Sequence, residues 1–153
     1  MTIRIERADF SRPDLVAFLQ AHLDDLAPTA PAESRHALDL TMLQAPHVRL
    51  WVVYDDDQIV GTGALAELGP GHEELKSMRT DPTRRRQGIA RLVLAFLLDD
   101  AAARGIGRIS LETGSMAFFA PARAMYAAAG FEECGPFGDY VEDPNSVFMS
   151  RAL

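Results

Sequence analysis

The sequence predicts a mixed α/β fold, in which a β-sheet is flanked by helices. Short segments with alternating or β-branched apolar residues are typical of strands, and they are interspersed with segments whose apolar residues recur every three to four positions. Two helical segments come early and strand–helix–strand units follow, which is the order of a mixed sheet. The length of 153 residues predicts a single domain over residues 1–153.

The first half of the chain predicts one strand, two helices and a hairpin. Pro13 stands where helices begin, and Pro46 ends the second helical pattern. The polar run 55–58 separates two apolar segments and predicts a hairpin turn. In chain order the predicted elements are a strand over 2–7, helices over 14–26 and 32–43, and strands over 48–54 and 59–68.

The second half begins after the break Gly69-Pro70-Gly71 and contains the clearest helix of the chain. Residues 88–104 carry Ile89, Val93 and Leu97 on one face, and Gly105 ends the pattern. In chain order the predicted elements are a strand over 73–80, the helix over 88–104, a strand over 108–113, a helix over 118–129, and strands over 131–134 and 147–151.

Composition narrows the class of protein. One cysteine, Cys134, excludes an internal disulfide and favours a reducing compartment. The first ten residues lack the apolar run of a signal peptide, and no apolar stretch reaches the length of a membrane span, so we expect a cytoplasmic protein with no membrane partner. The net charge of −7 argues against a nucleic-acid partner. The four histidines show no metal-ligand spacing, so no metal is expected.

Residues 76–90 carry the pattern most informative about function. A strand is followed by a turn with Arg84, Arg85 and Arg86, and Gly88 opens the long helix. The first N–H groups of a helix have no internal partners, the helix dipole is positive there, and arginines attract phosphate. Taken separately, the glycine could be a cap and the arginines a solvated loop, but in this order they predict a pyrophosphate site. Neither a Walker loop nor a dinucleotide fingerprint is present.

These residues resemble the GNAT acetyltransferases. Arg85-x-x-Gly88-x-Ala90 is similar to the family's signature, and Ala122-x-x-Met125-Tyr126-x-x-x-Gly130-Phe131 is similar to its closing helix and next strand. The stretch 73–149 also looks like a bacterial subgroup of the family whose members are called acetyltransferases because of their similarity to characterised enzymes. The resemblance implies a mostly antiparallel twisted sheet of six or seven strands, about four helices, and a splay between two central parallel strands, here 73–80 and 108–113.

The resemblance also implies how acetyl-CoA is bound as co-substrate. Met78, Arg79 and Thr80 would pair with the pantetheine arm, and one of their N–H groups would polarise the acetyl carbonyl. The backbone N–H groups that would hold the pyrophosphate belong to Arg85, Arg86, Gln87, Gly88, Ile89 and Ala90.

The expected reaction is direct attack of an amine on the thioester in a ternary complex, which needs a base for the ammonium and an acid for the thiolate. Glu74 is the candidate base, because it lies fourteen positions before Gly88, the spacing of family members with a glutamate base. On a strand it would share a face with Lys76, Met78 and Thr80. An equal alternative is that Glu74 is a solvated carboxylate at a strand edge. The other candidates for the base are Glu73, Glu112 and His72, and the proton could also pass to the base through a water molecule.

Tyr126 is the candidate acid, since the resemblance places it near the sulfur of coenzyme A; a core tyrosine is the alternative. The sequence departs from the family pattern at Phe119. Seven positions before the tyrosine, many relatives have an asparagine whose side chain contacts pantetheine, and here that position is Phe119. Thr113 or Ser115 could supply that hydrogen bond instead.

The acceptor is expected to be a primary amine of a small molecule. Arg35, Arg49 and Trp51 are candidate substrate-binding residues, and with Arg79 the arginines could hold a carboxylate of an amino-acid-like acceptor. The favoured alternative is that these arginines only balance nearby acids. The acidic surface would also suit a polyamine, or a peptide or protein amine. An acyl-CoA sensor without turnover and a P-loop-like nucleotide enzyme are the competing classes of function. Relatives are often dimers, so a homodimer is expected.

Overall fold

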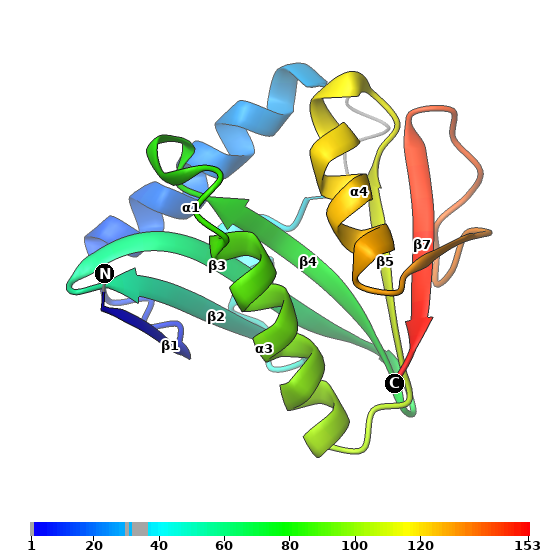
Figure 1. The fold of residues 1–153 in the computed structure, drawn as a ribbon, viewed down its shortest axis with the longest axis horizontal. Helices are drawn as coiled ribbons and strands as arrows, with labels where there is room; N and C mark the ends of the chain where they lie inside the picture. Colours follow the sequence, from blue (N-terminus) through cyan, green and yellow to red (C-terminus); the bar gives the residue numbers. More distant parts are fainter. Residues whose placement is uncertain (1, 30, 32–36) are drawn as a thin grey trace.

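The computed structural model describes residues 2–29, 31 and 37–153, which form a seven-stranded sheet (Figure 1). The strand order is β1-β2-β3-β4-β5-β7-β6, and every neighbouring pair is antiparallel except β4 and β5. The strands are β1 (Ile3–Arg7), β2 (Val48–Asp55), β3 (Gln58–Gly69), β4 (His72–Thr80), β5 (Arg108–Gly114), β6 (Glu132–Cys134) and β7 (Ser146–Ala152). The mixed, mostly antiparallel sheet with one parallel pair is the predicted fold class.

Four α-helices are described, and they cover both faces of the sheet. Helices α3 and α4 cross one face (Figure 1) and pack on a core that contains Leu97 and Leu111, whereas α1 and α2 pack on the other face against Leu50 and Ala64. Their bounds are α1 Pro13–Leu26, α2 Leu40–Leu43, α3 Ile89–Ala103 and α4 Ala120–Ala128. None of the helices in the described part of the chain is long and apolar enough to span a membrane.

The helix predicted over residues 32–43 is much shorter in the part that the structure describes. Residues 37–39 are not helical, and α2 forms a single turn that begins after Asp39. The Asp39 side chain accepts a hydrogen bond from the N–H of Met42, so a cap stands where the pattern predicted the helix interior. Residues 32–36 lie outside the described residues.

The parallel pair holds together over only four residue positions. Residues 72–75 of β4 pair with residues 108–111 of β5, and beyond Leu75 and Leu111 the two strands separate (Figure 1). The predicted splay between these two strands is confirmed. Its two arms are residues 76–80 and residues 112–114.

A bulge at Ser77 changes which face the end of β4 presents. Ser77 has a φ of 55°, and the register with β3 shifts beside it. Lys76 is paired with Ala64 on the α1 face, whereas the Met78 side chain packs with the core under α3. The prediction that Glu74, Lys76, Met78 and Thr80 share one face is therefore correct for Lys76 and wrong for Met78, because the bulge adds one residue to the alternation.

Gly63 and Gly69 of β3 provide a test of the packing between the sheet and α3. A Cβ on Gly63 would lie 2.8 Å from Leu97 Cδ1 and 2.9 Å from Met78 Sδ, whereas a Cβ on Gly69 would meet nothing within 4 Å. We expect Gly63→Ala to lower the free energy of unfolding by about 1–2 kcal/mol through overpacking. The matched control Gly69→Ala should leave it unchanged or raise it slightly. Urea denaturation measures both, and equal stability of the two variants would contradict this packing.

Candidate functional site

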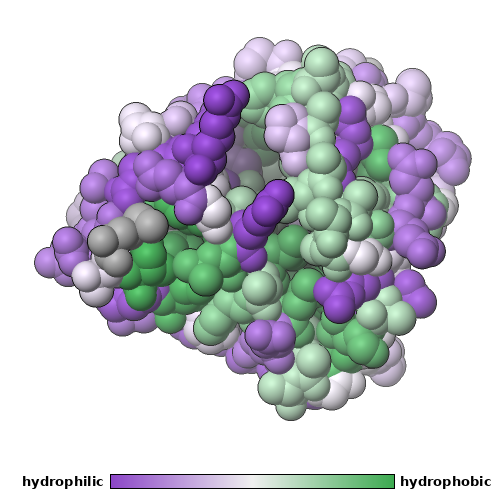
Figure 2. Space-filling view, viewed as in Figure 1, coloured by the Kyte–Doolittle hydropathy of each residue, from purple (hydrophilic) through white to green (hydrophobic). Residues whose placement is uncertain are grey.

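A cleft of about 350 Å³ opens where β4 and β5 separate. One wall comes from α1, the floor from the two diverging strands, and the opposite wall from the β5–α4 turn and α4. Figure 2 shows the molecule hollowed in this region, with hydrophilic side chains on one rim and largely hydrophobic ones along the other. Beyond Leu75 the backbone of β4 has no strand partner on its β5 side within the described chain, so its polar groups there can pair with an extended ligand.

The loop between β4 and α3 has the geometry of an anion site. Gly88 precedes the first turn of α3 with a φ of 80°, a conformation that favours glycine, and no side chain crowds it within 4 Å. The guanidinium of Arg84 is bound by Asp55 at 2.5 Å and by Gln87 at 3.0 Å, so it anchors the loop to the β2–β3 hairpin. Arg85 and Arg86 are exposed. The loop and its two exposed arginines fit a pyrophosphate. The sequence pattern did not show that Arg84 differs from Arg85 and Arg86 in being bound within the protein.

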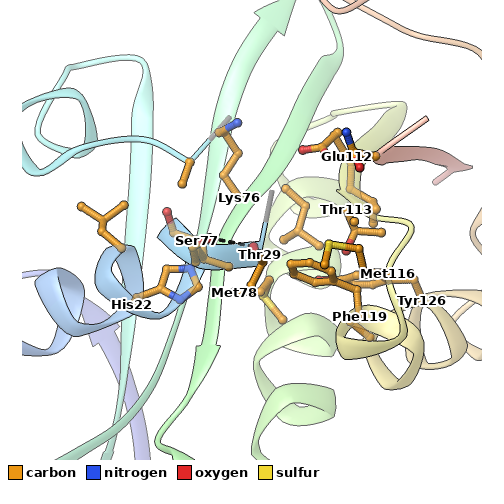
Figure 3. A pocket seen from close by; sticks show the side chains of 18 of the residues that line it. His22, Thr29, Lys76, Ser77, Met78, Glu112, Thr113, Met116, Phe119 and Tyr126 are labelled. Carbon is orange, nitrogen blue, oxygen red and sulfur yellow. Dashed lines mark hydrogen bonds between the residues drawn. The ribbon is translucent and has the colours of Figure 1, made fainter. Parts of the chain in front are cut away.

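Glu74 belongs to a buried polar cluster on the α1 face. Its Oε2 accepts hydrogen bonds from Lys76 Nζ at 3.1 Å and from the Tyr140 hydroxyl at 2.5 Å, and Lys76 Nζ also donates to Tyr140 at 2.9 Å. Burial and the charge of Glu74 raise the pKa of Tyr140, so its hydroxyl stays protonated and donates. The Lys76 side chain lines the cleft (Figure 3), whereas Glu74 is not among the described residues that line it and is joined to the cleft through Lys76.

The fold places the three alternative candidates for the base, Glu73, His72 and Glu112, in three different surroundings. Glu73 is on the α3 face, where it binds Arg104 with two hydrogen bonds of 2.7 and 2.8 Å. His72 shares a 2.7 Å hydrogen bond with the buried Ser110. Glu112 stands just beyond the last β4–β5 pair and lines the cleft (Figure 3).

Tyr126 lines the cleft from α4. It is buried, and burial raises the pKa of its phenol because the phenolate would lose hydration. Its ring packs edge-on against Phe131, 5.9 Å between centroids, while its hydroxyl makes no hydrogen bond to the described part of the chain. A protonated phenol directed to a cleft can donate a proton to a leaving group.

His22 of α1 faces the cleft from the opposite wall, next to Ser77 (Figure 3). Burial and the nearby positive charge of Arg79 lower the pKa of His22 to about 4. The imidazole is therefore neutral near pH 7 and offers a hydrogen-bond acceptor as well as a donor.

Two of the predicted substrate-binding residues, Arg49 and Trp51, lie away from the cleft. Arg49 and Trp51 of β2 face α3, where Arg49 lies 3.7 Å from Asp100 and the Trp51 ring packs on Phe96. They are not among the described residues that line the cleft. Arg79 is held on α1 by Asp25 and lies over the Phe18 ring, and Arg35 is outside the described residues.

Several residues of the site are not marked individually by the sequence pattern. Tyr140 reaches Glu74 from a loop 66 positions away. His22 and Met116 line the cleft from a helix face and a turn that read as ordinary surface. Among the described residues, no group of three or more histidine, cysteine, aspartate or glutamate side chains is arranged to hold a metal ion.

Known proteins with the same arrangement identify the family. The acetyltransferase (GNAT) family matches residues 15–131. The chain is 45% identical over all of its 153 residues, and over the whole relative, to the uncharacterized N-acetyltransferase YsnE of Bacillus subtilis. It is 42% identical to the uncharacterized N-acetyltransferase YedL of Escherichia coli, covering 97% of this chain and 94% of that protein.

A solved structure agrees over the whole fold. A Klebsiella pneumoniae protein provisionally named an acyl-CoA N-acyltransferase superposes with a TM-score of 0.82 at 29% identity, covering 99% of this chain and 98% of that one. The chain belongs to the GNAT family and is an acetyl-CoA-dependent acyltransferase.

The neutral state of His22 makes stability depend on pH. The folded protein holds this imidazole at a pKa of about 4, while the unfolded chain has the ordinary value of 6.5. Between those values the unfolded state binds more protons, so stability falls as the pH falls. We expect a loss of about 2 kcal/mol between pH 6.5 and 5 from this residue.

Urea denaturation of the native protein and His22→Gln across this range measures the effect. The variant should lose less stability on acidification than the native protein. Parallel pH profiles would show that His22 is not held neutral.

Proposed function

We propose that the protein transfers the acetyl group of acetyl-CoA to a primary amine of a small molecule, by direct attack in a ternary complex. The observation that carries the proposal is the cleft between β4 and β5, which is lined by Lys76, Glu112 and Tyr126 and lies beside the unpaired end of the strand that leads into the Gly88 loop. Its volume of about 350 Å³ is at the small end of ligand sites, which favours a small acceptor.

The cofactor enters from the α3 side in this proposal. The N–H groups of residues 85–90 bind the pyrophosphate at the start of α3, where the helix dipole adds to the attraction. The unpaired edge of β4 at residues 78–80 binds the amides of the pantetheine arm as an added strand. The N–H of Met78 then stabilises the oxyanion that forms when the amine attacks.

The acceptor enters from the α1 side, where the carboxylates lie. The amine loses a proton toward Glu74, through the Tyr140 hydroxyl or a water molecule, because Lys76 stands between Glu74 and the cleft. The neutral nitrogen forms a bond to the acetyl carbon, and the carbon–sulfur bond breaks as the intermediate collapses. Tyr126 gives its proton to the departing thiolate, and the second proton that the bonded nitrogen loses on forming the amide returns to Tyr126 directly or through solvent.

The charges of the cleft give little support for arginine-held carboxylates, and Glu112 is the group that could attract an amine. Of the described residues that line it, Lys76 is the only lysine or arginine and Glu112 the only carboxylate. Arg49 and Trp51 face α3 and Arg79 is engaged by Asp25, so we leave these three residues out of the proposed acceptor site.

Release of thiol from acetyl-CoA, measured with a panel of small amines, tests the proposal. Amine-dependent thiol release with an acetylated product is the expected result. Binding of acetyl-CoA with no turnover on any small amine or peptide would instead favour a sensor of acyl-CoA.

The anion site has its own test. We expect Arg85→Ala to weaken acetyl-CoA binding about tenfold, since one charge-assisted contact is lost, and to reduce the dependence of binding on salt. The control is Arg108→Ala, which removes an arginine that bonds Ser150 at the far end of β5. Calorimetric titration with acetyl-CoA should show weaker binding for Arg85→Ala and unchanged binding for Arg108→Ala. Equal affinities of the two variants would show that this loop does not bind the pyrophosphate.

The catalytic assignments are tested by three conservative variants. Glu74→Gln and Tyr126→Phe should each lower kcat about a hundredfold, because each removes a proton acceptor or donor while keeping the shape of the side chain. Glu112→Gln is the comparison and should mainly raise KM for the amine. If Glu112→Gln causes the larger loss of kcat, Glu112 is the base; if none of the three lowers kcat, both assignments are wrong.

A further inference from the structure

We infer that the Phe119 ring, held in place by Gly114, limits the acyl group that the enzyme transfers to a short chain. The inference rests on the proposed function, because it takes the cleft as the place where the acyl thioester lies. It concerns which residue restricts the acyl donor, a role that neither the family nor the relatives assign to this position.

Phe119 projects into the space where the thioester would react. It lines the cleft from the start of α4, and Figure 3 shows its ring directed from the α4 side toward β4, beside Met116. Ala122 and Tyr126 lie on the same face of α4, three and seven positions further on. Helical side chains lean toward the N-terminus, so the Tyr126 ring extends over the small Ala122 toward Phe119. The proposed acid and this ring therefore share one part of the cleft.

Gly114 fixes the position of the ring from behind. A Cβ on residue 114 would lie 2.1, 2.3 and 2.9 Å from three atoms of the Phe119 ring. The ring therefore occupies the volume that any side chain at the end of β5 would need, and it packs directly on the glycine backbone. It has no room to retreat in that direction.

The turn that carries the ring is braced on both sides. Arg123 Nη1 donates to the carbonyl oxygens of Gly114 at 2.7 Å and Met116 at 3.0 Å. Ser115 bonds the β6–β7 connection through its N–H and its hydroxyl. The edge of the Phe118 ring meets Phe119 with 5.0 Å between centroids. The hydrogen bonds hold the backbone of the turn in place, and Gly114 and Phe118 contact the ring itself, so the ring acts as a fixed wall.

A fixed apolar wall discriminates by length. An acetyl group adds one methyl beyond the carbonyl, whereas a butanoyl group adds two further methylenes that must share the cleft with the ring. Each added methylene that does not fit a protein site typically changes kcat/KM by about tenfold or more. The geometry predicts acetyl-CoA as the preferred donor, with propanoyl-CoA next and butanoyl-CoA poorly used.

The experiment compares acetyl-, propanoyl-, butanoyl- and hexanoyl-CoA with the native protein and two single variants, by binding and by acyl transfer to one amine. Native protein should use butanoyl-CoA at least about tenfold less well than acetyl-CoA. Phe119→Ala should narrow that ratio to about threefold or less by removing the wall. Leu92→Ala is the control: it removes an apolar side chain of α3 that is 44% exposed and does not line the cleft, and it should leave the ratio unchanged.

Gly114→Ala gives an independent test from the other direction. The added methyl group would push the ring into the cleft and lower use of acetyl-CoA as well, and in the double variant with Phe119→Ala this loss should disappear because the two residues are in contact. Equal use of all four donors by the native protein, or an unchanged ratio in Phe119→Ala, would overturn the inference. Failure to bind or use acetyl-CoA at all would instead count against the proposed function.

Discussion

The separation of β4 from β5 after four residue pairs is the constraint on which the rest of the structure depends. The pairs that do form are held by Leu75, Ile109 and Leu111, all buried in the core beneath α3 and α4. The bulge at Ser77 then turns β4 away, with Thr62 Oγ1 donating to the Ser77 carbonyl at 2.8 Å. Backbone groups that a continuous sheet would pair are left facing a cleft, and such groups need a partner. The same interruption that weakens the sheet creates its binding edge.

The bulge also divides the chemistry between the two faces of the sheet. Before it, Glu74 and Lys76 face α1; after it, Met78 faces α3, whose N-terminal end carries the anion site. Two reactants can thus approach from opposite sides and meet where the strands part. A regular strand would have put Met78 and Glu74 on one face, and one reactant would then have blocked the other.

Much of this arrangement follows from the sequence, and the remainder depends on contacts that a local pattern does not encode. The strands, α3 and the glycine before it are specified locally, by alternation, by periodicity and by a φ that favours glycine. Alternation places Arg49 and Trp51 on one face of β2 but does not say which face, and the structure turns that face to α3. The bulge occurs at a serine, with no glycine or proline beside it to mark it. The contact of Tyr140 with Glu74 joins residues 66 positions apart.

Burial acts differently on Tyr126 and Glu74, the two groups that the proposed mechanism uses for proton transfer. On the α4 side, burial raises the pKa of Tyr126, which alone would make it a weaker acid. A thiolate released into the same apolar surroundings is disfavoured for the same reason. The pKa values of the Tyr126 phenol and of the coenzyme A thiol therefore rise together, and the difference between them changes little. On the α1 side the burial of Glu74 is compensated by hydrogen bonds, because Lys76 Nζ and the Tyr140 hydroxyl both donate to its Oε2. In the proposed mechanism the same two residues also join Glu74 to the cleft, so the contacts that make its burial tolerable would be the route of the proton.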